Sequence, residues 1–147
     1  MECNFKDIEI TELNIRPYKL DDQQQVIELW HRCNLVVPWN DPKRDIELKL
    51  QFQPDLFLVA ALDNLILGSV MAGYEGHRGW INYLAVLPEY QHKGIGKLMM
   101  KAAEAELKKL GCLKVNLQVR SHNKSIIAFY EKLGFTDSNV IGMGKWL

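Results

Sequence analysis

The spacing of apolar residues divides the chain into helical and extended segments. Alternation of apolar and polar residues over residues 13–17 predicts a first strand that ends at a proline. A helix follows, capped by Asp21 and running to about His31 or Arg32. A second helix is expected to begin at Asp41-Pro42, because Asp is a favoured N-cap and Pro a favoured first helical residue.

The middle of the chain reads as three antiparallel strands joined by short turns. A continuous apolar run covers residues 56–62, and a second strand is expected over residues 65–73 after the turn Asp63-Asn64. A second turn over residues 76–79 leads into a central strand, which Pro88 ends because proline cannot continue a hydrogen-bonded ladder.

The pattern becomes helical again from Ile95 to Leu110, with Gly111 placed to end the helix. An alternating strand over residues 113–119 follows, and the helical connection predicts that it runs parallel to the central strand through a right-handed crossover. A last helix, capped by Ser121 or Asn123, is expected to end at Gly134. One or two final strands are expected over residues 135–147, broken near residues 137–139.

The order of these elements, β-α-α-β-β-β-α-β-α-β(-β), predicts an α/β (α+β) fold. Its sheet is mixed and mostly antiparallel, with helices on both faces. A length of 147 residues suits one domain over residues 1–147, with residues 1–10 a loosely held lead-in.

Composition excludes several classes of partner. Eighteen basic and 18 acidic side chains give a net charge of zero, so neither nucleic acid nor a membrane is expected as a general partner. No run approaches the ~18 apolar residues of a membrane span, and no signal peptide is evident. The three cysteines are widely separated, so no metal site is expected and a reduced, cytoplasmic protein is the simplest interpretation.

The junction between the central strand and the long helix suits a phosphate. Residues 91–96 supply backbone N–H groups at a helix N-terminus, where the helix dipole favours an anion. Gly94 and Gly96 allow a ligand to approach the backbone, and His92, Lys93 and Lys97 add positive or potentially positive charge.

Two familiar phosphate motifs do not fit this spacing. A P-loop requires glycine where Gln91 stands and serine or threonine where Leu98 stands, and a dinucleotide fingerprint requires a third glycine at Met99. The string Gln-x-x-Gly-x-Gly after Leu-Ala-Val-x-Pro instead resembles the acetyl-CoA-binding loop of the GNAT superfamily of N-acetyltransferases. The resemblance implies two groups of cofactor-binding residues: Gln91, His92, Lys93, Gly94, Ile95, Gly96 and Lys97 at the pyrophosphate, and Leu84, Ala85 and Val86 at the pantetheine arm.

Residues 123–135 resemble the second marked motif of the same superfamily, an asparagine followed by a helix that contains a tyrosine and ends in Gly-Phe. The resemblance implies that Asn123 hydrogen-bonds the pantetheine arm, that Tyr130 is the general acid at the sulfur, and that Lys132 approaches the nucleotide. It covers nearly the whole chain. The Pro-Trp-Asn-Asp-Pro and Gly-Tyr-x-Gly-His-Arg-Gly stretches are similar to those of the small bacterial YpeA-like branch.

The chemistry of acetyl transfer is consistent with these residues. An amine attacks the thioester carbonyl, and a backbone N–H near residues 84–86 can polarise the carbonyl oxygen. A phenol with a reference pKa of ~10 is neutral and can protonate the leaving thiolate at Tyr130. No nucleophilic cysteine is required, and Cys112 is expected to be a buried packing residue.

The residue that removes the amine's proton is less clearly marked. Glu75 is the first candidate for a general base, acting directly or through water, and His77 is the alternative, although both lie in a turn where solvated charge is ordinary. Asn82 stands where many members of the superfamily carry an acid, which weakens a simple one-base assignment. Trp39 either lines the acceptor pocket or fills space between two helices.

The sequence therefore predicts an enzyme that moves acetyl from acetyl-CoA directly to a primary amine in a ternary complex, without a metal. The amine is a small molecule or a peptide or protein amine, and the protein is a monomer or homodimer. The first alternative is a non-enzymatic acyl-CoA-binding or sensing domain of the same fold. The second is an interaction domain whose loop binds nothing.

Overall fold

The computed structural model describes residues 12–147, and the expected lead-in over residues 1–10 lies outside them. Five strands form one sheet in the order β1-β2-β3-β4-β5. The strands are β1 (Asn14–Pro17), β2 (Phe57–Leu62), β3 (Leu65–Tyr74), β4 (Gly79–Val86) and β5 (Val115–Leu117). The α-helices are α1 (Gln23–Arg32), α2 (Pro42–Leu50), α3 (Ile95–Lys109) and α4 (Lys124–Lys132).

Strand directions agree with the sequence-based topology. Strands β1 to β4 pair antiparallel, and β5 pairs parallel to β4 after the crossover through α3. The β2–β3 hairpin turns at Asp63, whose φ of +51° uses the tolerance of Asp for the left-handed region. The predicted fold class, a mixed and mostly antiparallel sheet with helices on both faces, is confirmed.

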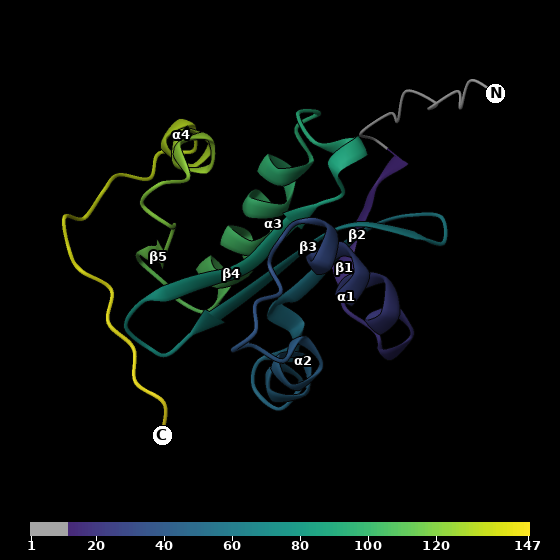
Figure 1. The fold of residues 1–147 in the computed structure, drawn as a ribbon, viewed down its shortest axis with the longest axis horizontal. Coiled ribbons are helices and arrows are strands. Elements are labelled where there is room, and N and C mark those ends of the chain that lie inside the picture. Colours follow the sequence, from purple (N-terminus) through teal and green to yellow (C-terminus); the bar gives the residue numbers. More distant parts are fainter. Residues whose placement is uncertain (1–11) are drawn as a thin grey trace.

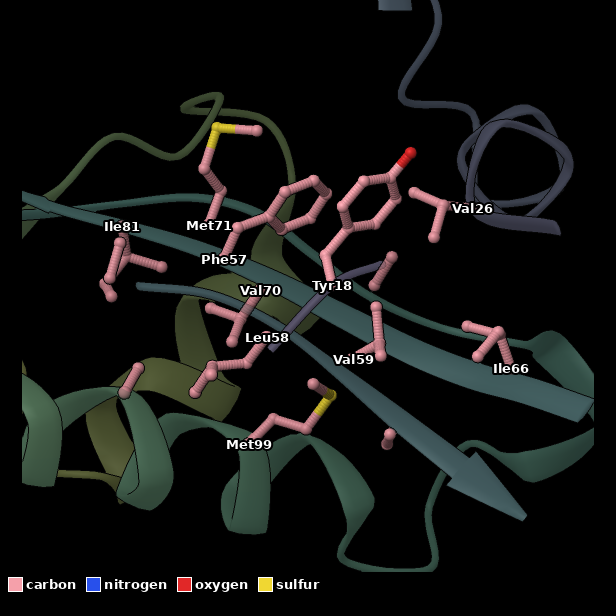
Figure 2. Packing of buried hydrophobic residues seen from close by; sticks show 14 of the residues in the cluster. Tyr18, Val26, Phe57, Leu58, Val59, Ile66, Val70, Met71, Ile81 and Met99 are labelled. Carbon is pink, nitrogen blue, oxygen red and sulfur yellow. The ribbon is translucent and has the colours of Figure 1, made fainter. Parts of the chain in front are cut away.

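The helices cover the sheet from two sides. In Figure 1, α1 and α2 lie on one side of the sheet and α3 lies on the other. Figure 2 shows Met99 of α3 packing beneath the strands, with Phe57 and Tyr18 on the opposite side beside Val26 of α1. Val26 and Met99 are both fully buried, so the core has one apolar layer on each side of the sheet.

Two helix starts agree with the sequence and one does not. Asp41 caps α2 by accepting from the amides of Lys43 and Arg44, and Asn123, rather than Ser121, caps α4. The prediction that Asp21 caps the first helix is wrong. The chain forms a 3-10 turn over Leu20–Asp22, and the buried Asp22 carboxylate turns back to Arg16 on β1.

Side chains at the end of α2 hold this helix against β3. The Gln53 amide donates to Tyr74 O and accepts from Tyr74 N, both at 2.8 Å, which imitates the pairing of a neighbouring strand. The Lys49 ammonium donates to Ala72 O, and burial lowers the pKa of Lys49 to about 8. The position of α2 over the sheet is therefore set by polar bonds as well as by apolar packing.

The final strands predicted over residues 135–147 do not form. Residues 136–147 follow an exposed, irregular path (Figure 1), and within the described residues β4 is the only strand paired with β5. Asn139 has a φ of +54°, which is not a strand conformation, and side chains of the segment such as Ile141 and Trp146 are exposed and outside the core. Strand composition alone does not make a strand where the side chains find no packing surface.

In the described part of the chain, no helix is both long and apolar enough to cross a membrane.

Candidate functional site

The loop after β4 is bound tightly to the sheet. Leu87 N donates to Leu67 O at 2.8 Å, and Gln91 Nε2 donates to Val86 O at 2.9 Å, which closes the loop over the strand end. Gln91 therefore shapes the predicted phosphate loop through its side chain. The Cys33 thiol also donates to Val86 O, at 3.2 Å, and burial raises the pKa of this thiol, so it stays protonated.

The start of α3 presents free amides, although the Gln91 amide, one of those expected to be free, donates to Pro88 O at 3.4 Å. His92 and Gly94 adopt φ values of +61° and +84°, which turn the chain sharply into the helix. Gly94 is the N-cap and no side chain caps it, and the bond from Leu98 N to Gly94 O is the first of the α-helical ladder. The amides of Ile95, Gly96 and Lys97 therefore precede the intrahelical bonds and point outward, where an anion can accept from them.

Three elements meet at Gly96. A Cβ added to Gly96 would lie 3.2 Å from Phe129 Cζ of α4 and 4.0 Å from Val86 Cγ2 at the end of β4. The predicted pyrophosphate loop, the predicted pantetheine strand and the predicted acid-bearing helix are therefore in contact. This convergence is a property of the fold, since 33 positions separate residues 96 and 129.

Tyr130 lies in an aromatic environment on α4. Its ring makes edge contacts with Phe129 and Phe135, at centroid distances of 5.1 Å and 5.5 Å. Burial raises the pKa of Tyr130 to about 12, so the phenol is protonated across the physiological range. A protonated phenol in an apolar setting can donate to a developing thiolate.

The other residues assigned to the cofactor have different surroundings. Asn123 Oδ1 accepts from Ile126 N at 3.4 Å, so its side chain caps α4 from the side of the β5–α4 loop. Lys132 is exposed in the last turn of α4. Their roles toward coenzyme A stay predictions.

Glu75 lies at the hairpin between β3 and β4. Its carboxylate accepts from the amides of His77 and Arg78, which caps the turn. Because Tyr74 pairs with Gly79 at the start of β4, the hairpin is about 16 Å along the strand from Leu84. Proton removal by Glu75 or His77 stays a prediction, and it requires an acceptor or a water chain that spans this length.

Asn82, a further residue predicted to contact the acceptor, lies on β4, and Trp39 lies in the loop between α1 and α2. Asn82 is exposed on β4 and pairs with Met71 of β3. Trp39 is 58% exposed, and its ring centroid lies 5.9 Å from the Arg120 guanidinium carbon, beyond the end of β5. Trp39 therefore reaches across to the β5–α4 loop and is too exposed to fill space between α1 and α2, and its role in lining an acceptor pocket stays a prediction.

Sequence reasoning missed the residues that surround Tyr83. Tyr83 has a φ of +52° within a strand, and its hydroxyl donates to Asp45 of α2. The one sequence signal for this arrangement is Ser69, a hydroxyl in an otherwise apolar strand, which is completely buried and accepts from the indole N–H of Trp30. In the described residues, no group of three or more His, Cys, Asp or Glu side chains is arranged to hold a metal ion.

Comparison with known proteins agrees with this geometry. Residues 23–135 match the sequence profile of the acetyltransferase (GNAT) family. An acetyltransferase of Pectobacterium atrosepticum is 47% identical over 135 residues, covering 92% of this chain and 96% of its own, and one of Sodalis glossinidius is 46% identical over 136 residues with the same coverage. Among solved structures, a PaiA N-acetyltransferase of Thermoplasma acidophilum in complex with coenzyme A superposes with a TM-score of 0.73 at 25% identity, covering 88% of this chain and 93% of its own.

Proposed function

Because the chain belongs to the acetyltransferase (GNAT) family and is an acyltransferase, we propose that it transfers acetyl from acetyl-CoA directly to a primary amine. The observation that carries this proposal is the contact of Gly96, Val86 and Phe129, which joins an uncapped helix N-terminus, a strand end and the tyrosine-bearing helix. Acyl-CoA as cosubstrate is consistent with the complex of the Thermoplasma acidophilum neighbour with coenzyme A.

The residues that would hold acetyl-CoA fit its chemistry. Acetyl-CoA supplies an activated acetyl thioester and carries an anionic pyrophosphate. The outward amides of Ile95, Gly96 and Lys97 suit the pyrophosphate, and the loop residues from Gln91 to Gly94 extend the same cradle. Backbone amides of Leu84, Ala85 and Val86 would bind the pantetheine arm and polarise the acetyl carbonyl.

The transfer step is direct. The amine nitrogen forms a bond to the carbonyl carbon as the carbon–sulfur bond breaks, and the electron pair of that bond leaves on sulfur. Tyr130 donates its proton to this sulfur and is reprotonated from solvent, while the proton lost by the amine leaves through Glu75, His77 or water. Tyr130 is protonated at neutral pH and so has a proton to donate, while burial, which raises its pKa to about 12, makes it a weaker acid than a free phenol.

A non-enzymatic acyl-CoA-binding domain is not favoured as the alternative, since relatives at 46–47% identity are named acetyltransferases. The two functions differ in one measurement. An enzyme releases free coenzyme A thiol when an amine is added to the acetyl-CoA complex, whereas a binding domain does not.

The test uses wild-type protein, acetyl-CoA and a panel of benzylamine, putrescine and short peptides with a free N-terminus or lysine. Thiol release and the acetylated product, identified by mass spectrometry, are expected for at least one amine. Acetyl-CoA binding without transfer to any of them would overturn the proposed function, as would the absence of saturable acetyl-CoA binding in calorimetry.

The variant Tyr130→Phe tests the acid. Removing the hydroxyl takes away the proton donor but leaves the aromatic packing, so kcat should fall about 100-fold while the Kd of acetyl-CoA changes less than about twofold. Tyr74→Phe is the matched control, because the Tyr74 hydroxyl bonds only the local turn at Gly76 O. Equal loss of binding and turnover in Tyr130→Phe, or loss of neither, would contradict the assignment.

A further inference from the structure

The centre of β4 carries a strained residue. Tyr83 has a φ of +52°, in the left-handed region that costs a side-chain-bearing residue about 1–2 kcal/mol. The strand register shifts at this point, because Ser69 pairs with Ala85 while Met71 pairs with Asn82. Tyr83 and Leu84 thus face the single residue between them on β3, which is the arrangement of a β-bulge.

Buried side chains from α1 and β3 hold this bulge in place. The Tyr83 ring stacks on Trp30 at a centroid distance of 3.8 Å and an interplanar angle of 13°. The Ser69 hydroxyl donates to Tyr83 O at 2.8 Å, and Trp30 Nε1 donates to Ser69 Oγ at 2.8 Å. Both Trp30 and Ser69 are completely buried, so the tyrosine cannot relax without disturbing the core.

The strained tyrosine reaches a carboxylate on α2. Its hydroxyl donates to Asp45 Oδ2 at 2.5 Å, a bond between residues 38 positions apart. Burial raises the pKa of Tyr83, and the bond to Asp45 with its negative charge raises it further, so the phenol stays protonated and keeps donating. In the described part of the chain this is the only hydrogen bond to the Asp45 side chain, which leaves Oδ1 as an open acceptor.

The Asp45 carboxylate lies beside residues 84–86 of β4, the segment proposed to bind the acetyl thioester. Tyr83 directly precedes Leu84, so its side chain links the start of that segment to Asp45. The loop that leads into α2 carries Trp39, whose ring lies against Arg120 beyond β5. A group bound at Asp45 would therefore lie beside Tyr83 at the centre of β4, at the start of α2.

We propose that Asp45 binds the ammonium group of the acceptor and that Tyr83 positions the carboxylate for it, so the enzyme selects cationic primary amines. The bound ammonium then loses its proton through Glu75, His77 or water, and the neutral nitrogen attacks the thioester carbonyl. The inference rests on the proposed function and deepens it by naming the substrate class. A carboxylate with one oxygen held by a phenol and the other free can accept a hydrogen bond from an ammonium without losing its position. Asp45 is a specificity-determining residue, and Tyr83 is a positioning residue.

The decisive comparison is among wild type, Asp45→Asn and the control Glu47→Gln. An asparagine oxygen can still accept from Tyr83, so Asp45→Asn removes the charge and keeps the contact. The KM of benzylamine, a cation at neutral pH, should rise at least tenfold in Asp45→Asn, while kcat changes less than about threefold and the Kd of acetyl-CoA stays within about twofold. Glu47→Gln removes the same charge from the exposed part of α2, and its KM should match wild type.

A neutral analogue and a second variant complete the test. Benzyl alcohol lacks the charge, so its inhibition constant against benzylamine should be the same in wild type and Asp45→Asn. Tyr83→Phe leaves the carboxylate charged but releases it, and the KM of benzylamine should rise about threefold or more. If Asp45→Asn does not fold, Tyr83→Phe becomes the test of the inference. An unchanged KM of benzylamine in Tyr83→Phe then overturns the inference.

Failure of the inference is distinguishable from failure of the proposed function. Wild-type protein that binds acetyl-CoA but acetylates no amine overturns the proposed function, and the inference with it, before any variant is compared. Wild-type turnover of benzylamine with equal KM in Asp45→Asn and Glu47→Gln overturns the inference alone. A lowered melting temperature in Asp45→Asn with an unchanged KM would show that the Asp45–Tyr83 bond only stabilises the packing of α2 on β4. This result would also overturn the inference.

Discussion

At the scale of single residues, the pair formed by Asp22 and Arg16 fastens the start of α1 to β1. Two parallel hydrogen bonds of 2.8 Å and 3.0 Å join the guanidinium to the carboxylate, and Lys19 N donates to the same carboxylate. Burial alone would raise the pKa of Asp22, but the hydrogen bonds and positive charge of Arg16 and the bond from Lys19 N outweigh it and lower the pKa below its ordinary 3.8.

The variant Asp22→Asn should lower the free energy of unfolding at pH 7 by about 2 kcal/mol, because it leaves a half-buried guanidinium without its charged partner. A carboxyl whose pKa is lower in the folded state contributes stability above its unfolded pKa and loses it as pH falls. The difference in free energy of unfolding between wild type and Asp22→Asn should therefore be constant from pH 7 to about pH 5. It should become smaller below about pH 4. Urea denaturation at a series of pH values measures both effects.

The neighbouring Asp21 supplies the control for this experiment. Asp21 is exposed, so Asp21→Asn should change stability by less than about 0.5 kcal/mol at any of these pH values. Two results would contradict the role given to the Asp22–Arg16 pair. One is a similar loss of unfolding free energy in both variants, and the other is a loss in Asp22→Asn that does not depend on pH.

At the scale of elements, the contact of α3 with the sheet requires a glycine in β3. A Cβ added to Gly68 would lie 2.7 Å from Met99 Sδ of α3 and 3.0 Å from Ala85 O of β4. The methionine end can move, but the Ala85 carbonyl belongs to the neighbouring strand and cannot move freely. Close approach of helix and strand, rather than a special backbone conformation, is therefore the reason for glycine here.

The variant Gly68→Ala should reduce the free energy of unfolding by about 1–3 kcal/mol, the usual cost of forcing an extra carbon into a packed core. Met99→Ala by itself should cost about 2–5 kcal/mol, because Met99 is fully buried. In that background Gly68→Ala should cost less than in wild type but still lower the free energy of unfolding, since the clash with Ala85 O remains. Gly144→Ala is the control, because nothing lies within 4 Å of the added carbon there. A double variant as stable as Met99→Ala alone would show that the strands themselves have room for the methyl group.

At the scale of the whole molecule, the sheet ends in an open edge at β5 and the chain leaves it as an exposed tail. Every residue from 136 to 147 is exposed, and Val140, Ile141 and Met143 are 78%, 88% and 91% accessible. The tail passes Gln118 at Gly142 without joining the ladder. An open strand edge next to exposed apolar residues is also a place where two copies of a protein can associate.

Truncation after Phe135 should lower the free energy of unfolding by less than about 1 kcal/mol, because the removed side chains bury little apolar surface. Thermal and urea denaturation of the truncated and full-length proteins measure the difference. A loss above about 3 kcal/mol would show that residues 136–147 are packed or paired in solution and would favour the final strands predicted from the sequence.

The sequence by itself determined the features that depend on neighbours in the chain. Apolar spacing located the four helices and the central strands, Asp41 and Pro42 marked the start of α2, and the two glycines after β4 marked the start of α3. These features are encoded within a few residues, because hydrogen bonds in helices, turns and caps join residues that are close in sequence. The family motifs also lie in such local segments.

Only the tertiary structure decided the features that join distant segments. Whether Asp22 or Asp21 is used at the start of α1 depends on Arg16 across the turn. Whether residues 135–147 form a strand depends on whether this segment packs against the open edge of the sheet at β5. The pairing of Asp45 with Tyr83 depends on a bulge in β4 and on the packing of α2 over the sheet. No local pattern encodes such contacts, because each is set by the register and packing of elements that meet only in the folded protein.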